Sequence, residues 1–243
     1  MTSIDEVLAP LLKRILEEAG IPQNDAVISA LCVYLRELET WNRRMDLSGI
    51  QDMEGLALKF VGDTAPFAPL VPTGTRTVLD IGTGAGAPGL VLKILLPQLE
   101  VVLVDALRKR VSFLRHVIAL LGLTGVTAHH GRVGEPGIPH IHPPEGFDLV
   151  TSQAVGSLDL LTRLAIPLLG PGGVVVAFKG PKAAAEVKVY REILAQRGFL
   201  AKTIPVRQPV SGLPRTLVFL RRNPSSLEHS PSLSSHGNRE KTS

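Results

Sequence analysis

The period of the hydrophobic positions changes near residue 76. Before it, apolar side chains recur every three or four residues and predict two helices, 5–19 and 24–44. Gly20 supplies a C-cap for the first helix. The apolar residues of the second share one face: Val27, Leu31, Tyr34, Leu35, Leu38 and Trp41. With the mixed stretch 45–75, these helices predict an N-terminal helical segment over residues 1–75.

From residue 77 onward, strand patterns alternate with helix patterns. Strands are predicted at 77–81, 100–104, 125–129, 147–151, 173–178, 200–206 and 215–221, and helices at 88–96, 108–121, 157–169 and 182–197. Near-continuous apolar strands separated by helices predict a parallel sheet covered on both faces. Only 208–214 separates the last two strands, too little for a crossover helix, so the final strand should be antiparallel. The expected fold is α/β, with a seven-stranded, mostly parallel sheet and helices on both faces.

Composition agrees with one globular unit over 76–223 joined to the N-terminal segment. The chain has 243 residues, 44% of them hydrophobic, which is enough for a sizeable core. Its net charge of +4 permits a nucleic-acid partner without requiring one. Residues 224–243 are serine-rich and nearly free of large apolar side chains, so they are predicted to form a disordered tail.

Several function classes are disfavoured. A single cysteine, Cys32, excludes a disulfide framework and a thiolate zinc site within one chain. The start of the chain lacks the features of a signal peptide, and no uncharged apolar run reaches the ~18 residues of a membrane helix. The histidines at 129, 130, 140 and 142 have no carboxylate at ligand spacing and are interpreted as a loop cluster. We therefore expect a cytoplasmic protein with no membrane partner and no metal.

The strongest local signal is the glycine-rich turn from Val78 to Gly89. Glycines at 82, 84 and 86 let the backbone turn sharply and approach a ligand, and the next helix presents its N-terminus to that ligand. Asp105 stands 23 positions after Gly82, at the end of the second strand. There its carboxylate can accept both ribose hydroxyls of an adenosine. The turn therefore predicts a nucleotide-like cofactor.

Three interpretations of the turn compete: S-adenosylmethionine, a dinucleotide, or a tight turn without a ligand. The pattern Gly82-x-Gly84-x-x-Ala87 also satisfies a relaxed dinucleotide fingerprint. Asp80 favours the first interpretation, because a carboxylate beside the loop would repel a pyrophosphate and attract the ammonium of a methionine moiety. We therefore expect a methyltransferase that uses S-adenosylmethionine, with the other two left as alternatives.

The residues after the fourth strand narrow the choice of methyl acceptor. Enzymes that methylate exocyclic amines carry an Asp/Asn-Pro-Pro-aromatic motif there, whereas this chain has Ser152-Gln-Ala-Val155. Pyrimidine carbon-5 methylation needs a thiolate, and Cys32 is interpreted as core. Guanine N7 has a lone pair and no proton to remove, so orientation would carry most of the rate. The missing base motif is consistent with N7 chemistry and does not establish it.

Several motifs together resemble the ribosomal RNA small subunit methyltransferase G family, also called glucose-inhibited division protein B. Trp41-Asn-Arg-Arg-Met-Asp-Leu-Ser48 is similar to its W-N-x-x-x-N-L-T signature. Asp80-x-Gly-Thr-Gly-x-Gly-x-Pro-Gly89 and Leu103-Val-Asp-Ala-Leu-x-Lys-Arg-Val-x-Phe-Leu114 also match, and together they are specific. Gly131-Arg-Val133, Ser152-Gln-Ala154 and Phe178-Lys-Gly180 extend the resemblance over roughly residues 10–223.

The resemblance implies N7 methylation of a guanine in the decoding-region loop of 16S rRNA, by a protein with the Rossmann-like class I S-adenosylmethionine methyltransferase fold. Separately, we expect a monomer. The partner would be 16S rRNA or the small ribosomal subunit. The cofactor-binding residues carried over are Gly82, Gly84 and Ala87 around the methionine end, Asp105 at the ribose, Val133 and Gly134 at the adenine, and Gln153 near the transfer site. The chain departs from the family pattern at Asp46 (Asn), Lys59 (His), Thr64 (Ser), Gly134 (acidic) and Gln153 (Arg).

Basic residues supply further candidates. Arg132 and Lys179 follow strands, where ligands bind in open α/β sheets, and with Gln153 they are candidates for substrate positioning. Two basic groups could contact RNA phosphates or simply face solvent: Arg108, Lys109, Arg110 and Arg115, and the pair Arg43 and Arg44 beside Trp41. Two rival functions remain: a methyltransferase acting on another RNA, a small molecule or a protein, and a non-catalytic RNA-binding protein that retains the cofactor pocket.

Overall fold

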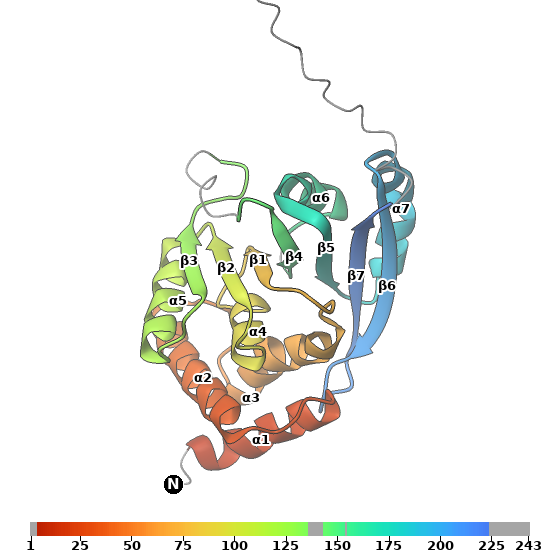
Figure 1. Cartoon of the computed structure of the whole chain (residues 1–243). Helices are drawn as coiled ribbons and strands as arrows, with labels where there is room; N and C mark the ends of the chain where they lie inside the picture. The colour runs from red at the N-terminus through yellow and green to blue at the C-terminus, as the bar shows by residue number, and fades with distance from the viewer. Residues whose placement is uncertain (1–3, 136–142, 154, 224–243) are drawn as a thin grey trace, which may run out of the picture.

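The centre of the molecule is a seven-stranded sheet with the order β3-β2-β1-β4-β5-β7-β6 (Figure 1). The computed structural model describes residues 4–135, 143–153 and 155–223. The strands are β1 (Thr77–Ile81), β2 (Glu100–Asp105), β3 (Val126–His130), β4 (Phe147–Ser152), β5 (Leu169–Lys179), β6 (Phe199–Arg207) and β7 (Pro214–Arg222). Strands β1 to β5 pair in parallel, and β7 is antiparallel to both of its neighbours. The predicted topology, including the antiparallel final strand, is confirmed.

Helices cover both faces of this sheet. They are α1 (Ile4–Glu18), α2 (Asp25–Met45), α3 (Met53–Leu56), the π-helical η1 (Ala57–Gly62), the 3₁₀ turn η2 (Ala65–Leu70), α4 (Gly89–Leu95), α5 (Arg108–Leu120), α6 (Leu158–Ala165), the 3₁₀ turn η3 (Ile166–Leu168) and α7 (Ala183–Gln196). Helices α4 and α5 pack against β1, β2 and β3, whereas α6 and α7 pack against β5 and β6. None of the helices described has the length and hydropathy needed to cross a membrane.

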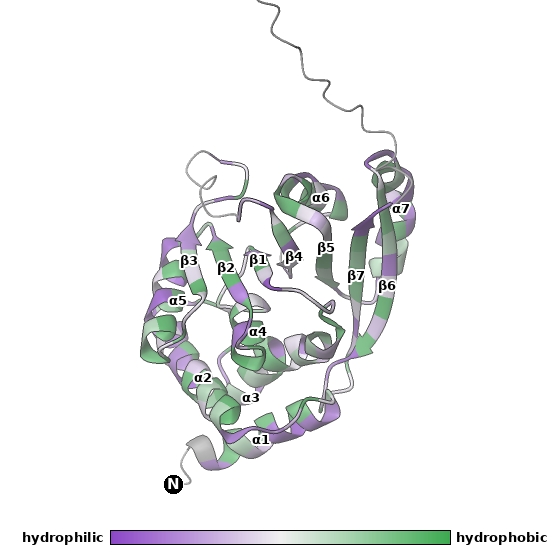
Figure 2. Cartoon of the chain, in the orientation of Figure 1, coloured by the Kyte–Doolittle hydropathy of each residue, from purple (hydrophilic) through white to green (hydrophobic). Residues whose placement is uncertain are grey.

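The pleat of each strand divides the core into two clusters. In β5, Val174 and Val176 face one cluster while Val175 and Ala177 face the other. Figure 2 shows hydrophobic residues along the central strands. The first cluster continues into the N-terminal segment through residues such as Leu12 on α1 and Leu31 on α2. Residues 4–75 and the sheet therefore share one hydrophobic core. The predicted tail 224–243 lies outside the described residues.

The region between α6 and β5 differs from the expected helix 157–169 followed by a strand from 173. The α-helix ends at Ala165, a 3₁₀ turn follows, and β5 already begins at Leu169. Pro167 lacks the N–H that would continue the α-helical ladder. A Cβ on Gly170 would lie only 2.6 Å from the Glu145 carbonyl oxygen, so glycine lets the two backbones come close enough to start the strand early.

The Trp41–Ser48 motif builds the turn that ends α2. Asn42 is 3% exposed, and its Oδ1 accepts hydrogen bonds from the backbone N–H groups of Leu47 (2.7 Å) and Ser48 (2.9 Å). Its Nδ2 donates to the carbonyl of Ile50. Asp46 is the C-cap in the left-handed conformation, which Asn and Asp tolerate better than most residues. Asp46 at the family's Asn position is therefore compatible with the same turn.

We predict that Asn42→Ala lowers the free energy of unfolding by about 2–4 kcal/mol, because it leaves buried backbone groups without partners. Thr40→Ala, on the exposed side of the same helix, should change it by less than about 0.5 kcal/mol. Urea unfolding measures both variants. Equal effects would show that the Asn42 side chain does not hold the turn.

Candidate functional site

The glycine-rich turn is fastened to the end of β2. The backbone N–H groups of Gly82 and Thr83 donate to the Val104 carbonyl at 2.9 and 3.1 Å, and the Gly84 N–H donates to Asp105 Oδ2 at 2.9 Å. Gly84 has φ of 61°, a left-handed conformation that glycine adopts without strain. The turn therefore lies directly beside the carboxylate predicted to hold a ribose.

Asp105 connects three loops at this edge of the sheet. Its side chain is buried, and Oδ1 accepts a hydrogen bond from the Leu107 N–H at 2.9 Å. Its backbone carbonyl accepts from Gly131, which leads into the predicted adenine loop. Arg110 Nη1 lies 3.5 Å from Oδ2. Each carboxylate oxygen has more than one lone pair, so these contacts leave acceptor capacity for hydroxyl groups.

Asp80, which the sequence analysis expected beside the loop, lies buried beneath the turn. It is fully buried, with Oδ2 accepting from the Gly89 N–H and Oδ1 from the Thr151 hydroxyl, both at 2.9 Å. A Cβ on Gly89 would lie 2.7 Å from the Asp80 Cβ, so only glycine allows α4 to begin this close to β1. Burial raises the pKa of Asp80 to about 6, so the group is mostly ionised at neutral pH. Its charge can act on a ligand through the field and through the position of α4.

Helix α2 supports the turn from the other side. Tyr34 is fully buried, and its hydroxyl donates to the Ala85 carbonyl at 2.9 Å. Burial raises the pKa of the Tyr34 phenol well above its usual range, so it remains a neutral donor. Sequence reasoning counted Tyr34 only as part of an apolar face. A period of apolar positions does not distinguish a phenol from a phenyl ring.

The residues of this cradle fit an adenosine-type cofactor. The turn offers glycines at close approach, and Asp105 offers carboxylate oxygens at its side. The Thr83 hydroxyl is buried beside Asp80 and opposes the rise in the pKa of that carboxyl. Gly134, at the predicted adenine end, has φ of 93°, which favours glycine over the acidic residue of the family pattern. Val133 packs into the core beside it.

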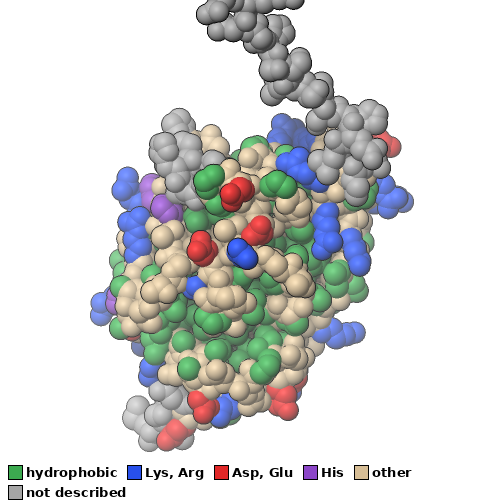
Figure 3. Space-filling model, in the orientation of Figure 1, with side chains coloured by type: hydrophobic (Ala, Val, Ile, Leu, Met, Phe, Trp, Pro, Cys, Tyr) green, Lys and Arg blue, Asp and Glu red, His purple; other side chains and the backbone are tan. Residues whose placement is uncertain are grey.

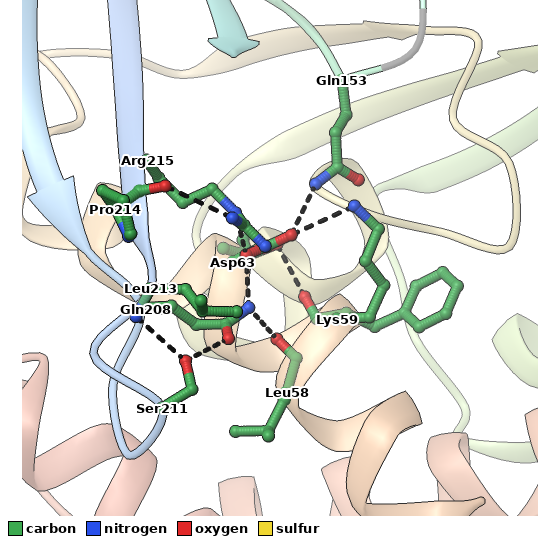
Figure 4. Close-up of polar contacts among 11 residues, drawn as sticks. Leu58, Lys59, Asp63, Gln153, Gln208, Ser211, Leu213, Pro214 and Arg215 are labelled. Atoms are coloured by element: carbon green, nitrogen blue, oxygen red, sulfur yellow. Dashed lines mark hydrogen bonds and ion pairs between the residues drawn. The ribbon is translucent and has the colours of Figure 1, made fainter. Parts of the chain in front are cut away.

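A second part of the site is a pocket of about 230 Å³ at the same edge of the sheet. Its lining residues come from η1, the loop after β4, the end of β5 and the start of β7: Lys59, Asp63, Gln153, Phe178, Lys179, Gly180, Arg215, Thr216 and Leu217. Figure 4 shows Lys59, Gln153 and Arg215 converging on Asp63 from separate segments of the chain. The carboxyl ends of parallel strands are where open α/β sheets bind ligands. The pocket therefore lies at the edge of the sheet where a ligand is expected to bind.

Asp63 joins the walls of this pocket (Figure 4). Its side chain is 2% exposed, with Arg215 Nε 2.8 Å from Oδ1 and Lys59 Nζ 3.1 Å from Oδ2. Gln153 Nε2 also donates to Oδ2, at 3.3 Å, and Gln208 Nε2 donates to Oδ1. One buried carboxylate thus receives donors from four segments of the chain.

Lys59 and Gln153, two residues that depart from the family pattern, therefore both donate to Asp63 Oδ2. Gln153 carries no charge, and the Lys59 ammonium supplies a cation beside it. The third departure, Thr64, is conservative in function, because its hydroxyl donates to the Phe60 carbonyl at 2.8 Å as a serine hydroxyl could.

The three residues predicted to position substrate separate into two places. Gln153 and Lys179 line the pocket together. Lys179 Nζ donates to the Gly156 carbonyl at 2.8 Å and lies 3.2 Å from Glu186 Oε1, so contacts within the protein orient it. Arg132 is exposed in the loop after β3, separated from the loop after β4 by β2 and β1, or about 14 Å of sheet.

Sequence reasoning missed Arg215 and Gln208. The antiparallel direction of the final strand was a usable signal, because the start of such a strand lies at the carboxyl edge of its parallel neighbours. Lys179 is indeed in register with Thr216, next to Arg215. Gln208 carried no comparable signal, since a glutamine in a short hairpin loop has no spacing that marks it.

Most of the α5 cations predicted as RNA contacts or solvated residues bind protein carbonyls. Lys109 Nζ donates to the carbonyls of Met45 (2.5 Å) and Asp46 (3.0 Å), which places a cation at the C-terminus of α2. Arg110 lies 3.4 Å from the Leu47 carbonyl, and Arg115 donates to that of Ala128 at 3.0 Å. Arg108 is exposed.

Most of the remaining candidate residues make contacts within the protein. Trp41 packs edge-on against Phe113 with ring centroids 5.7 Å apart, and Arg43 pairs with Glu39 at 2.7 Å. Arg44 is exposed, and Cys32 is buried on α2 as expected. No group of three or more His, Cys, Asp or Glu side chains suited to a metal occurs in the part of the chain described, which omits residues 140 and 142.

Comparison with known proteins identifies clear sequence relatives. A family model described as rRNA small subunit methyltransferase G (GidB) matches residues 27–211. The ribosomal RNA small subunit methyltransferase G of Syntrophotalea carbinolica is 35% identical over 214 residues, which cover 88% of this chain and 97% of the relative. That of Desulfitobacterium hafniense is 43% identical over 177 residues, 73% of each chain.

Solved structures with little sequence similarity share the fold. The O-methyltransferase TomG from Streptomyces achromogenes, solved in complex with S-adenosylmethionine, has a TM-score of 0.51 at 19% identity and covers 84% of this chain and 92% of its own. A putative O-methyltransferase from Klebsiella pneumoniae has a TM-score of 0.53 at 15% identity and covers 85% and 93%. The expected α/β methyltransferase fold is confirmed.

We predict that Asp80→Asn stabilises the ligand-free protein at neutral pH. Because the folded-state pKa of Asp80 is about 6, against an ordinary value of 3.8, the folded state holds the proton more tightly. The contribution of Asp80 to the free energy of unfolding is therefore full below about pH 4. It falls by at most about 3 kcal/mol as the pH rises through 6. Asparagine does not titrate, so the variant's advantage should disappear at low pH.

Asp148→Asn is the control, for which we expect the opposite change in the free energy of unfolding. Although burial opposes it, the N–H groups of Thr77 and Arg76 lower the pKa of Asp148. This variant should be less stable than wild type at neutral pH, and its deficit should shrink as pH falls through that lowered pKa. Chemical unfolding at several pH values measures both. A pH-independent gain for Asp80→Asn would contradict the assigned titration.

We also predict unequal coupling around Asp63. In double-mutant cycles with Asp63→Asn, Arg215→Gln should show an interaction of about 1–3 kcal/mol, since this pair is close and mostly buried. Lys59→Gln should show less than about 1 kcal/mol, because the lysine side chain is 41% exposed and screened by solvent. Unfolding free energies of the single and double variants give both values, and equal couplings would reject Arg215 as the main partner.

Proposed function

Because the chain belongs to the ribosomal RNA small subunit methyltransferase G family, we propose that it transfers the methyl group of S-adenosylmethionine to N7 of a guanine in the decoding-region loop of 16S rRNA. The observation that carries this proposal is the junction of the glycine-rich turn with Asp105, inside a family match that spans residues 27–211. The buried charge of Asp80 beneath the turn favours a cationic sulfonium cofactor over the pyrophosphate of a dinucleotide.

The cofactor would supply an electrophilic methyl group on a sulfonium. In this proposal the backbone of Gly82, Gly84 and Ala87 surrounds the methionine end, and Asp105 accepts hydrogen bonds from the ribose. Val133 and Gly134 border the adenine, and Gln153 lies near the transferred methyl. The hydrogen bonds from Tyr34 to Ala85 and from Gly84 to Asp105 support these roles, because they fix the cradle before a ligand arrives.

The acceptor side needs orientation more than proton transfer, because guanine N7 has no proton to lose. We assign this task to the pocket around Asp63, where Gln153 and Lys179 would position the base. Two cations, Lys59 and Arg215, pair with one carboxylate, that of Asp63. The pocket therefore has excess positive charge for a phosphate of the target nucleotide. Arg132 would contact RNA on the adenine side of the site.

Gln153 lacks the charge of the arginine in the family pattern, but Lys59 places a cation beside it. This replacement of the charge favours a catalytic protein over one that only retains the cofactor pocket. We further propose that the enzyme acts in the cytoplasm as a monomer, without a metal, on 16S rRNA or the small subunit. Residues 1–75 would serve as the segment that completes the acceptor pocket, and 76–223 as the methyltransferase domain. The tail 224–243 has no role in this proposal.

We predict that Asp105→Ala weakens S-adenosylmethionine binding at least tenfold, while Asp25→Ala, an exposed acid on α2, leaves it unchanged. Calorimetry measures both affinities. Absence of binding to the wild-type protein at millimolar cofactor would reject the cofactor assignment.

The substrate is tested by deleting the gene and mapping N7-methylguanine in 16S rRNA. The modification should disappear and should return with wild-type protein but not with Asp105→Ala. An unchanged modification pattern would reject the ribosomal assignment while leaving cofactor binding intact. Gln153→Arg in the same assay tests whether this position limits activity.

A further inference from the structure

A second groove lies at the outer end of the sheet, away from the acceptor pocket. It has a volume of about 420 Å³ and is lined by Leu70, Leu200, Ala201, Lys202, Ile204, Phe219, Arg221 and Arg222. Every charged residue of this lining is a cation. Figure 3 shows Lys and Arg side chains gathered on the side of the molecule that β6 and β7 form.

Two of these cations have no side-chain partner in the described part of the chain. Lys202 and Arg221 are exposed, and within the described residues neither forms an ion pair or a side-chain hydrogen bond. Arg222 differs, because its guanidinium lies 5.5 Å from the centre of the Phe199 ring. By contrast, Lys109, Arg110 and Arg115 on α5 are engaged with backbone carbonyls. The groove therefore presents charge that the fold itself does not use.

The strand register places these cations beside apolar surface. Leu200 is opposite Arg221 and Lys202 is opposite Phe219, so all four lie on one face of the β6–β7 pair. Leu200 is 52% exposed and Leu70 is 37% exposed, whereas Phe219 is only 5% exposed. The floor can contact a sugar or base edge, but it offers no open aromatic ring for stacking.

We propose that this groove binds the backbone of an RNA strand flanking the methylated nucleotide, with Lys202 and Arg221 on successive phosphates. This inference rests on the proposed rRNA substrate. The charge of the lining is complementary to phosphate alone, because no acidic side chain lines the groove. Contacts of this kind position RNA without reading its sequence.

Strand β7 connects the groove to the acceptor pocket. Arg215 lines the pocket at the start of the strand, and Arg221 lines the groove near its end. Because alternate residues point to the same face, Arg215, Leu217, Phe219 and Arg221 lie in one row. Six residues of extended chain span about 20 Å. An RNA held at both ends of this row would have its target nucleotide fixed relative to the cofactor.

The test compares Lys202→Gln/Arg221→Gln with Lys188→Gln/Arg191→Gln, two exposed cations on α7, on the opposite face of the sheet. Both double variants lose the same charge. Methyl transfer is measured on small subunits from cells that lack the gene, and RNA binding is measured over a range of salt concentrations. The groove variant should raise KM for the subunit about tenfold with kcat and cofactor affinity unchanged, and lower the salt slope of RNA binding by about 1.4. The α7 variant should change KM less than twofold.

Three results would overturn the proposal. Equal effects of the two double variants would mean that only bulk charge matters. A change in kcat alone would place the residues in catalysis or folding. If the groove substitutions changed neither KM for the subunit nor the salt slope of RNA binding, the groove would not bind RNA. Failure of the wild-type protein to methylate 16S rRNA would reject the proposed function separately, and the salt slopes would still decide whether the groove binds RNA.

Discussion

The site depends on the buried carboxylate of Asp80. It accepts a hydrogen bond from the first residue of α4 on one oxygen and from the end of β4 on the other. The turn must therefore close tightly enough for the Gly89 backbone to reach β1, which determines where the N-terminus of α4 points. Holding an ionised acid without solvent is costly, as its raised pKa indicates. The fold accepts this cost at the one position where a negative charge lies under the predicted binding site of a sulfonium.

Asp63 connects the segments of the acceptor pocket as Asp80 connects those of the cofactor cradle, but the two carboxylates have different partners. Asp80 has neutral donors, whereas Asp63 lies between the cations Lys59 and Arg215. One carboxylate paired with two cations leaves the surrounding pocket positive. The cofactor cradle is therefore organised around net negative charge and the acceptor pocket around net positive charge. This difference suits a cationic donor on one side and a polyanionic acceptor on the other.

The sequence was sufficient for the parts that depend on local pattern. The strands, the antiparallel β7 and the place of Asp105 could be predicted from apolar periodicity, connection length and glycine spacing. Contacts between distant segments, such as Tyr34 with Ala85 or Lys109 with the end of α2, could not be predicted. These contacts use residue types that also serve as apolar surface or solvated charge. Asp80 was recognised as part of the turn, but its depth is set by how closely α4 packs, which spacing alone does not reveal.

The N-terminal segment contributes side chains to both parts of the candidate site. It supplies Tyr34 to the cofactor turn and both Lys59 and Asp63 to the acceptor pocket, while its core is continuous with that of the sheet. Lys59 lies in the π-helical η1 and Asp63 directly follows that element, and the two side chains meet at the pocket. The sheet and its glycine turn can hold a cofactor in many methyltransferases, but the choice of acceptor must come from what is added to that frame. Here the additions are the segment of η1 and the antiparallel β7, and the Asp63–Arg215 pair joins them directly. In the proposed function, acceptor recognition therefore depends on two segments that the sheet alone does not bring together.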